Sequence, residues 1–347
     1  MDLENKIAIY ALDERGLAIA KRISFVYPSK IFLKRSYKHV ANEIIFFERL
    51  QDVVRENFKK FKYHVFICAV GIAVRMIAPY IESKDRDPGV VVVDTSGRFV
   101  ISVLSGHLGG ANELTRMIAS ELGAIDVITT ATDVLGLPAI DEIARKLDLE
   151  IDDIKKIKRI NLAIIDKRPI WIYDPFNFLD ISKFFPKDYP LFFVQKIMDL
   201  PLDKEGIICH YEDICLDEYK ILLHPKVLYV GVGCNSNTDF EEIYGLLQDV
   251  FEKNRLSTKS IKAIVTTEKK RDEKGIIELA KFLNRELIFI KHKMLDNIAV
   301  PNPSYKVKEH MGVFSVCEAA AMIASKGKII VEKTKTKNVT IAVAIKL

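Results

Sequence analysis

The strongest constraint on the fold is a repeated pattern in which a short, almost wholly apolar run precedes a segment of helical periodicity. The runs KIAIYA (6–11), HVFICAV (64–70) and VVVVD (90–94) have the continuous apolar character of strands buried on both faces. The segments ERGLAIAKRIS (14–24) and GIAVRMIAPYI (71–81), which follow two of these runs, have helical spacing. Strand and helix in alternation predict a doubly wound α/β sheet for the N-terminal part of the chain.

This alternation of strands and helices changes twice along the chain. The 347 residues are too many for one ordinary hydrophobic core. Between 150 and 225 the alternation is lost, and aromatic residues and prolines cluster at 171–201. A second regular α/β pattern starts with VLYVGVG (227–233). We therefore predict a doubly wound N-terminal α/β domain at 1–148, a less regular middle domain at 149–225, and a second, small α/β domain at 226–347.

Composition excludes several classes of protein. A hydrophobic content of 49% with 29% charged residues fits a globular chain and excludes a disordered one. No apolar run approaches the ~18 residues of a membrane helix, and the charged N-terminus lacks signal-peptide features, so a cytoplasmic location is expected. The five cysteines are scattered without a CxxC pair, which favours neither a zinc site nor a disulfide framework. The net charge of +5 is too modest to indicate nucleic acid but would attract a polyanionic small molecule.

The stretch richest in chemistry is SGHLGGANELT (105–115), a strand-to-helix turn after the predicted strand FVISVL (99–104). Glycines let a ligand approach the backbone closely, and the first turn of a helix attracts anions. His107 can transfer a proton near neutral pH, and Glu113 falls in the first helical turn. The pattern predicts a site that combines anion capture with proton transfer. The alternative is a turn whose glycines serve packing alone, with His107 as an ordinary satisfied residue.

Polar residues also follow the other predicted strands of the first domain, and ligands of open α/β sheets bind beyond the carboxyl ends of strands. We expect Arg75 and Lys84 to bind carboxylates, Arg75 in a bidentate manner. The candidate site of the first domain comprises Arg75, Lys84, Asp94, Ser105, Gly106, His107, Gly109, Gly110, Asn112, Glu113, Thr129, Thr130 and Asp133.

In the third domain, the turn GVGCNSNTD (231–239) opens another helix, and KAIVTT (262–267) ends in two threonines. Gly231, Gly233, Thr266 and Thr267 are therefore further candidates for substrate binding. Neither glycine turn has the pattern of a phosphate-binding P-loop, and neither has a dinucleotide fingerprint with its downstream acid. The sequence thus disfavours a nucleotide cofactor.

Several of these motifs together resemble the CbiG family of cobalamin biosynthesis. The N-terminal resemblance rests on GIAVRMIAPYIESKDRDPGVVVVD (71–94), SGHLGGANELT (105–115) and ITTATD (128–133). The family's third domain, which is related to CobE, is similar to the segments with GVGC (231–234), TTE (266–268) and GVFSVCEAAAM (312–322). One departure is NSNT (235–238), where the family usually has arginines after GxGC; this weakens the expectation of a carboxylate clamp there.

The resemblance implies the activity of a cobalt-precorrin-5A hydrolase. Such an enzyme opens a δ-lactone on a cobalt-bearing tetrapyrrole and releases a two-carbon fragment as acetaldehyde, giving cobalt-precorrin-5B. Cobalt arrives with the substrate, so no cofactor and no metal site of the protein are implied. The many carboxylates of this substrate suit the predicted cationic and anion-binding groups. The family also suggests neighbouring B12-pathway methyltransferases as partners, with no nucleic acid and no membrane.

For lactone opening, we expect His107 to act as the general base for water. The backbone N–H groups of Gly109 and Gly110 would stabilise the tetrahedral oxyanion, and Glu113 or Asp94 would orient the imidazole. His107 would serve again as base in the retro-aldol-like loss of acetaldehyde.

Three other hypotheses remain open from the sequence. A covalent route through Ser105 is less favoured, because this serine lacks a nucleophile-elbow motif. The chain is alternatively a non-catalytic protein that binds or carries a corrinoid intermediate. A hydrolase of an unrelated phosphorylated metabolite is disfavoured by the absence of a phosphate-loop motif.

Overall fold

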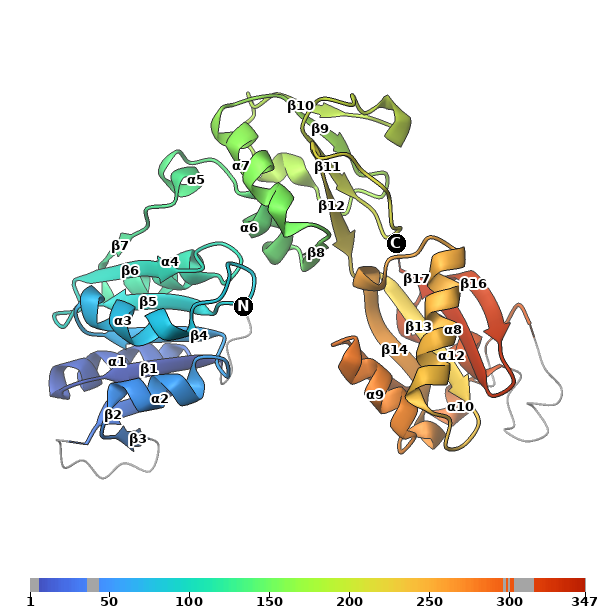
Figure 1. Ribbon diagram of the computed structural model, residues 1–347, viewed down its shortest axis with the longest axis horizontal. Coiled ribbons are helices and arrows are strands. Elements are labelled where there is room, and N and C mark those ends of the chain that lie inside the picture. Colours follow the sequence, from blue (N-terminus) through green and yellow to red (C-terminus); the bar gives the residue numbers. More distant parts are fainter. Residues whose placement is uncertain (1–5, 36–43, 296–297, 299, 303–314, 347) are drawn as a thin grey trace. The chain divides into compact units, whose positions relative to one another are not determined.

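The computed structural model describes residues 6–35, 44–295, 298, 300–302 and 315–346, so residues 312–314 of the motif GVFSVCEAAAM lie outside the described part. Contacts divide the chain into two compact units, one of 1–145, 164–167 and 184–186, the other of 146–163, 168–183 and 187–347. The first unit contains a seven-stranded sheet, and the second contains two five-stranded sheets (Figure 1). The predicted α/β class is confirmed. The domain limits at 148 and 225 stay predictions, because contacts group the second and third sheets together.

The first sheet has the strand order β3-β2-β1-β4-β5-β6-β7. Its strands are β1 (Ile7–Ala11), β2 (Ser29–Lys34), β3 (Ile44–Phe47), β4 (Tyr63–Ile67), β5 (Gly89–Val93), β6 (Phe99–Leu104) and β7 (Ile125–Val127). Strand β2 was not predicted, because lysines near its ends shorten its apolar run to the three residues at 31–33, all of which are buried.

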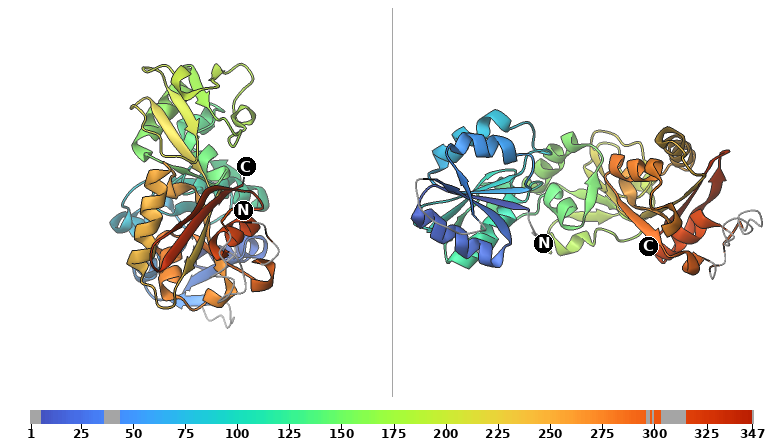
Figure 2. Two further views of the ribbon diagram at one scale, coloured as in Figure 1. Left: turned by 90° about the vertical axis from the view of Figure 1, so that its right-hand side faces the viewer. Right: turned by 90° about the horizontal axis from the view of Figure 1, so that it is seen from below.

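Helices cover both faces of this sheet, as the predicted doubly wound fold requires (Figure 2). Buried side chains of α1 (Glu14–Val26) and α4 (Ala111–Leu122) pack on one face. Those of α2 (Leu50–Asn57) and α3 (Val70–Ile77) pack on the other. Two shorter helices, α5 (Ala131–Val134) and α6 (Ile140–Lys146), follow β7.

Strand direction reverses in the middle of this sheet. Strands β3, β2, β1, β4 and β5 are parallel, β5 and β6 are antiparallel, and β6 and β7 are parallel. The turn TSGR (95–98) joining β5 to β6 is too short for the crossover that a parallel pair needs. Asp94 closes it, accepting backbone hydrogen bonds from Ser96 (3.0 Å), Arg98 (2.7 Å) and Phe99 (2.7 Å). The carboxyl ends of β6 and β7 therefore lie at the edge where β4 and β5 begin.

The second sheet has the order β10-β9-β11-β12-β8, parallel except for the antiparallel pair of β12 and β8. Its strands are β8 (Leu149–Ile151), β9 (Ile170–Tyr173), β10 (Leu191–Phe193), β11 (Gly206–Cys209) and β12 (Lys220–Pro225), accompanied by helix α7 (Ile157–Ile165). This region is more regular than its sequence indicates, because strands of three to six residues leave little periodic signal.

The third sheet has the order β15-β14-β13-β17-β16, and the expected α/β pattern that starts at VLYVGVG (227–233) is confirmed. The strands are β13 (Leu228–Cys234), β14 (Ile261–Thr267), β15 (Glu286–Ile290), β16 (Lys328–Lys335) and β17 (Val339–Ile345). The helices are α8 (Phe240–Lys253), α9 (Lys274–Phe282), α10 (His292–Leu295) and α12 (Val316–Ser325). Short 3₁₀ turns complete the chain at η1 (Ala78–Tyr80), η2 (Ile154–Lys156), η3 (Ile181–Lys183), η4 (Ile197–Asp199), η5 (Thr258–Ser260) and η6 (Glu268–Lys270). Among the described residues, no helix is both long and apolar enough to cross a membrane.

Candidate active site

The glycine turn between β6 and α4 packs tightly against the first residues of β4 and β5. A Cβ atom on Gly109 would lie 2.4 Å from the Cβ of Ser105, and one on Gly110 would lie 2.9 Å from the hydroxyl of Tyr63 in β4. Gly110 also has a φ of +78°, a conformation that favours glycine. A Cβ on Gly89, at the start of β5, would lie 2.8 Å from the carbonyl oxygen of Gly109. Packing therefore explains these glycines, and it also fixes the position of His107.

The His107 imidazole lies between two aspartates. Its Nε2 is 3.0 Å from Oδ2 of Asp133, and its Nδ1 is 3.5 Å from Oδ1 of Asp141. Thr132 places its hydroxyl 3.3 Å from the same Nε2. The side chain of His107 is 10% exposed, and Asp141 is completely buried. The imidazole is thus surrounded by polar groups close to the surface and is not sealed among aliphatic side chains.

These neighbours set the charge of the imidazole. Burial by itself would lower the pKa of His107, but hydrogen bonding and charge from Asp133 and Asp141 outweigh burial and raise the pKa to about 9. Burial would likewise raise the pKa of Asp133, but His107, Thr130 and Arg116 hold that pKa below its ordinary value. At neutral pH the centre is therefore an imidazolium with a carboxylate beside each ring nitrogen, an arrangement that satisfies both N–H donors.

Asn112, buried in the first turn of α4, holds Asp133 in place. Its Nδ2 donates to Oδ2 of Asp133 (2.9 Å) and to the hydroxyl of Thr130 (3.0 Å), while its Oδ1 accepts from the hydroxyl of Ser102 (2.7 Å). A Cβ on Gly106 would lie 2.6 Å from that Oδ1. The Gly106 and Asn112 of the motif thus position the carboxylate that faces His107.

Three cations surround the centre. Arg116 contacts Asp133 and is 46% exposed, and Lys84 lies 3.0 Å from Oδ2 of Asp141 and is 56% exposed. Arg145 donates from Nε to the carbonyl oxygen of His107 (2.9 Å) and from Nη2 to Glu113 (2.5 Å). Arg116 and Lys84 therefore present positive charge to solvent beside the aspartates.

The structure brings together six of the predicted residues, namely Lys84, Gly106, His107, Asn112, Thr130 and Asp133. Thr129 is exposed next to Thr130. The prediction that Glu113 or Asp94 orients the imidazole is wrong. Glu113 pairs with Arg145, and Asp94 closes the hairpin turn before β6, at the other end of that strand. The two aspartates at 133 and 141 take this role instead.

Arg75 does not join the site. It lies on α3, which begins where β4 ends, and its Nη1 donates to the carbonyl oxygen of Gly71 (3.3 Å). Because β6 is antiparallel to β5, this end of β4 is at the opposite edge of the sheet from His107. The prediction that Arg75 and His107 converge is therefore wrong.

The expected anion site at the start of α4 is also mostly absent, because the turn uses these donors itself. The N–H groups of Gly110, Ala111 and Asn112 donate to the carbonyl oxygens of His107 (3.0 Å), Ser105 (3.2 Å) and Gly106 (3.0 Å). The prediction that the Gly110 amide binds an oxyanion is wrong, and the role of the Gly109 amide stays a prediction. The Ser105 hydroxyl is buried without a hydrogen-bond partner among the described residues, unlike an exposed nucleophile.

The four candidates of the third sheet have structural explanations. A Cβ on Gly231 would lie 1.9 Å from the carbonyl oxygen of Cys317 in α12, and one on Gly233 would lie 2.6 Å from the hydroxyl of Thr340. Thr266 and Thr267 are fully buried; the hydroxyl of Thr266 donates to the carbonyl oxygen of Val232 (2.8 Å), and that of Thr267 lies 3.4 Å from a ring nitrogen of His292. Their role in substrate binding stays a prediction.

Sequence reasoning missed Asp141, Arg116 and Arg145, whereas Thr132 follows the predicted strand DVITT (126–130) and could be named with Thr130 and Asp133. Arg116 and Arg145 lie on helices whose sequences contain other charged residues, so nothing marks them. Asp141 carries a clearer signal. It lies between the apolar pairs Ala139–Ile140 and Ile143–Ala144, all of which are buried. Burying a carboxylate among such residues costs free energy unless the carboxylate has a partner. That pattern was the available signal for a functional acid.

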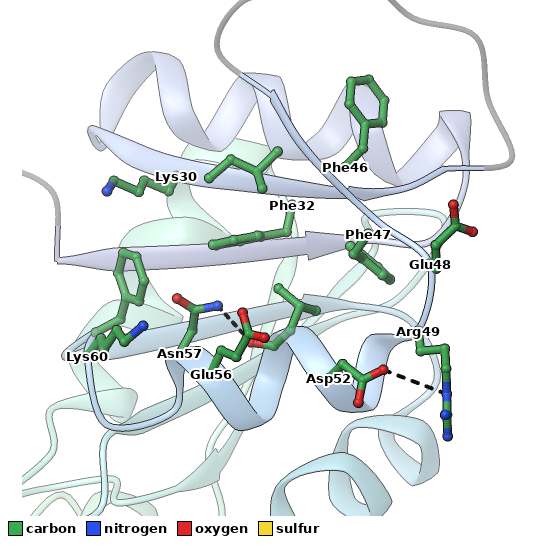
Figure 3. Close-up of a pocket in the computed structure, with 13 residues that line it drawn as sticks. Lys30, Phe32, Phe46, Phe47, Glu48, Arg49, Asp52, Glu56, Asn57 and Lys60 are labelled. Carbon is green, nitrogen blue, oxygen red and sulfur yellow. Dashed lines mark hydrogen bonds and ion pairs between the residues drawn. The ribbon is translucent and has the colours of Figure 1, made fainter.

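A cavity of about 690 Å³ lies away from this centre, between α2 and strands β2 and β3 (Figure 3). Phe32 and Phe47 contribute its apolar walls, and its charged lining mixes acids such as Asp52 and Glu56 with lysines and an arginine. Among the described residues that line it, there is no histidine, and three acids balance three basic side chains. A second cavity, of about 430 Å³, is lined by Leu108 and Gly109 and so adjoins the His107 turn. Within the described ranges, no group of three histidine, cysteine, aspartate or glutamate side chains could hold a metal ion.

Fold and site together define an α/β protein in which a histidine lies between two aspartates at one edge of the first sheet. Family models match three parts of the chain, namely Cobalamin synthesis G N-terminal at residues 52–133, Cobalamin biosynthesis central region at 138–209, and Cobalamin synthesis G C-terminus at 228–344. The chain belongs to this cobalamin synthesis G (CbiG) family.

Two relatives cover almost the whole chain. A cobalt-precorrin-5A hydrolase of Priestia megaterium is 31% identical over 362 residues, covering 97% of this chain and 94% of the relative. The cobalt-precorrin-5A hydrolase of Salmonella typhimurium is 31% identical over 352 residues, covering 98% and 97%. The crystal structure of CobE, a protein from the cobalamin (vitamin B12) biosynthetic pathway, is 27% identical over 35% of this chain and 92% of its own, with a TM-score of 0.33.

Proposed function

We propose that this chain is a cobalt-precorrin-5A hydrolase whose active centre is the His107–Asp133–Asp141 group. The observation that carries the proposal is the imidazole held between two carboxylates near the surface, with two exposed cations beside them. The family and the names of two nearly full-length relatives supply the substrate. Such a centre can give and take a proton, which is the chemistry that lactone hydrolysis needs.

In the first step, water adds to the lactone carbonyl and the ring C–O bond breaks. The departing oxygen takes a proton from the imidazolium of His107, and both protons of the attacking water are lost to solvent, so the products are a carboxylate, an alcohol and a neutral imidazole. Because His107 is protonated at neutral pH, it acts here as a general acid and not as the base predicted from sequence. Its positive charge also stabilises the oxyanion.

In the second step, the neutral imidazole of His107 takes the proton of the new alcohol. The C–C bond breaks, acetaldehyde leaves, and the bonding electron pair passes into the conjugated macrocycle. The proton taken in this step restores the imidazolium, so the centre returns to its starting state after one turnover. Asp133 and Asp141 hold the ring in one orientation through both steps. Cobalt takes part only as a component of the substrate, and other enzymes of the pathway as partners remain a prediction.

The direct test is anaerobic incubation of the purified chain with cobalt-precorrin-5A. We expect one acetaldehyde per substrate consumed, together with a change in the corrinoid absorption spectrum. A spectral binding shift without acetaldehyde would indicate instead the alternative, a protein that binds or carries a corrinoid intermediate. Neither binding nor turnover would reject the proposal entirely.

Turnover should also depend on pH in a direction set by His107. Because its pKa is raised to about 9 by the two aspartates, the imidazolium persists through neutral pH. We expect the turnover rate to fall as pH rises through about 9, where the acid of the first step is lost. A rate that instead rose between pH 6 and pH 8 would indicate that neutral imidazole is the active form at the start.

The same titration contributes to stability. A group whose pKa is raised on folding stabilises the folded state fully below its ordinary pKa of about 6.5 and loses that contribution as pH rises through its folded pKa. The loss between neutral pH and pH 10 should be about 3 kcal/mol in the free energy of unfolding. Comparison of wild type with His107→Gln by urea unfolding isolates this contribution, because the variant lacks the titrating group.

A further inference from the structure

Two large apolar side chains stand exposed directly after Asp133. Val134 is 70% exposed and Leu135 is 55% exposed, whereas Leu137 and Ala139, a few residues on, are buried. Aliphatic side chains in a helical turn beside a polar centre gain nothing from this exposure. The pair therefore needs an explanation other than the packing of the first unit.

The backbone holds this pair in a fixed position. The N–H groups of residues 134–137 donate to the carbonyl oxygens of residues 130–133, at 2.9 to 3.2 Å. The side chains of Thr130 and Asp133 in the same turn are tied to Asn112 of α4, and Thr132 is buried beside His107. The turn is thus anchored on the side of His107 and presents its two aliphatic side chains on the outside, beside the anchored Asp133.

The surroundings indicate what kind of molecule covers these side chains. Arg116, 46% exposed, contacts Asp133, and Lys84, 56% exposed, contacts the second aspartate, Asp141. A ligand that touches the apolar pair and also reaches His107 comes next to Asp133 and Asp141, which carry Arg116 and Lys84 as partners. It therefore combines an apolar surface with anionic groups at its edge, as a tetrapyrrole with peripheral carboxylates does.

We propose that Val134 and Leu135 form a docking face for the flat, apolar side of the tetrapyrrole, while Arg116 and Lys84 meet carboxylates at its periphery. This inference rests on the proposed function, and it adds which surface of the first unit takes the ring. Contact of the ring with the α5 turn places its edge, where the lactone is attached, next to His107. The aliphatic side chains act by contact area, so they contribute to binding and not to proton transfer.

A competing surface lies at the opposite edge of the same sheet. There α3 exposes Ile72 (37%) and Val74 (43%) beside Arg75. This surface has apolar side chains and a cation, but β6 and β5 run antiparallel, so α3 begins at the other edge of the sheet from the His107 centre. A ring bound there could not present its lactone to the imidazole while it is held by α3. Substitutions on the two surfaces are therefore expected to have opposite effects on substrate binding.

The test compares the double variant Val134→Asn/Leu135→Asn with the matched double variant Ile72→Asn/Val74→Asn in the full-length chain. For the α5 variant we expect KM for cobalt-precorrin-5A to rise about tenfold, with kcat within about twofold and the pH profile unchanged, because only contact area is lost. The α3 variant should keep the wild-type KM. Val134→Ile/Leu135→Met should restore KM, because it keeps the apolar area. Thermal unfolding confirms that each variant folds.

The outcomes separate this inference from the proposed function. If wild type turns over the substrate and the α5 variant keeps the wild-type KM, the docking face is overturned. The proposed hydrolase function is then unaffected. A raised KM in the α3 variant alone assigns the ring to the opposite edge and also overturns the docking face. Wild type that neither binds the substrate, by its difference absorption spectrum, nor releases acetaldehyde overturns the proposed function together with the docking face.

Discussion

Replacing His107 with alanine should lower the turnover of cobalt-precorrin-5A by roughly 100-fold or more, the usual contribution of a positioned proton donor. In the mechanism proposed above, this one imidazole protonates the departing lactone oxygen and then deprotonates the new alcohol. Its removal therefore affects both the opening of the lactone and the release of acetaldehyde. Single-turnover measurements of the corrinoid spectrum and of acetaldehyde would follow the two steps separately.

The matched comparison is Asp94→Asn, at a residue that sequence patterns associate with His107. The structure places Asp94 in the turn before β6, where its carboxylate accepts hydrogen bonds from three backbone N–H groups. We expect this variant to be less stable but to keep turnover within about twofold. Near-normal acetaldehyde release by His107→Ala would reject the assignment of the active centre.

The second large effect is expected for Asp133→Asn. Its carboxylate faces Nε2 of His107 and also contacts Arg116, Thr130 and Asn112, so the amide removes one negative charge that keeps the imidazole protonated. Turnover at neutral pH should fall about 100-fold, and the fall in rate with rising pH should begin at a lower pH than in wild type. Stability should fall by about 3 kcal/mol, because two cationic groups lose a largely buried partner.

A double-mutant cycle with His107→Ala tests whether Asp133 acts through the imidazole. If it does, the losses in turnover should be far from additive, because the second substitution removes a partner that is already without function. Fully additive losses in turnover would show that Asp133 acts on the substrate independently of His107. A pH profile of Asp133→Asn identical to that of wild type would contradict the charge argument.

Much of the fold follows from local patterns in the sequence. Buried parallel strands such as β4 and β5 are continuous apolar runs, and helices such as α1 and α4 have a clear apolar face, so both are visible without any tertiary information. Strand β2 and the short strands of the second sheet were missed or poorly delimited. Their apolar runs are too brief to be separated from loops, and only pairing with neighbouring strands makes them strands.

Some residues of the candidate site could likewise be predicted from the sequence, and others could not. His107, Asn112, Thr130 and Asp133 could be named from the sequence because each lies at a strand end or a helix start, and such ends meet at sheet edges. For Asp141 the sequence offers only a carboxylate between apolar pairs, because its contact with His107 depends on how α6 packs against the turn. Arg75 and Asp94 follow the ends of β4 and β5, which lie at the opposite edge of the sheet from the end of β6, so the prediction that they join His107 is wrong.

The sequence by itself determined the α/β class, the position of the glycine turn, and the family. Only the tertiary structure decided at which edge of the first sheet each strand ends. The physical reason is the five-residue connection DTSGR (94–98). It is long enough to form a hairpin and too short for a crossover, so β6 and β7 run antiparallel to β4 and β5. That reversal separates Arg75 and Asp94 from His107, and the packing of α5 and α6 then surrounds the imidazole with two aspartates whose charge keeps it protonated.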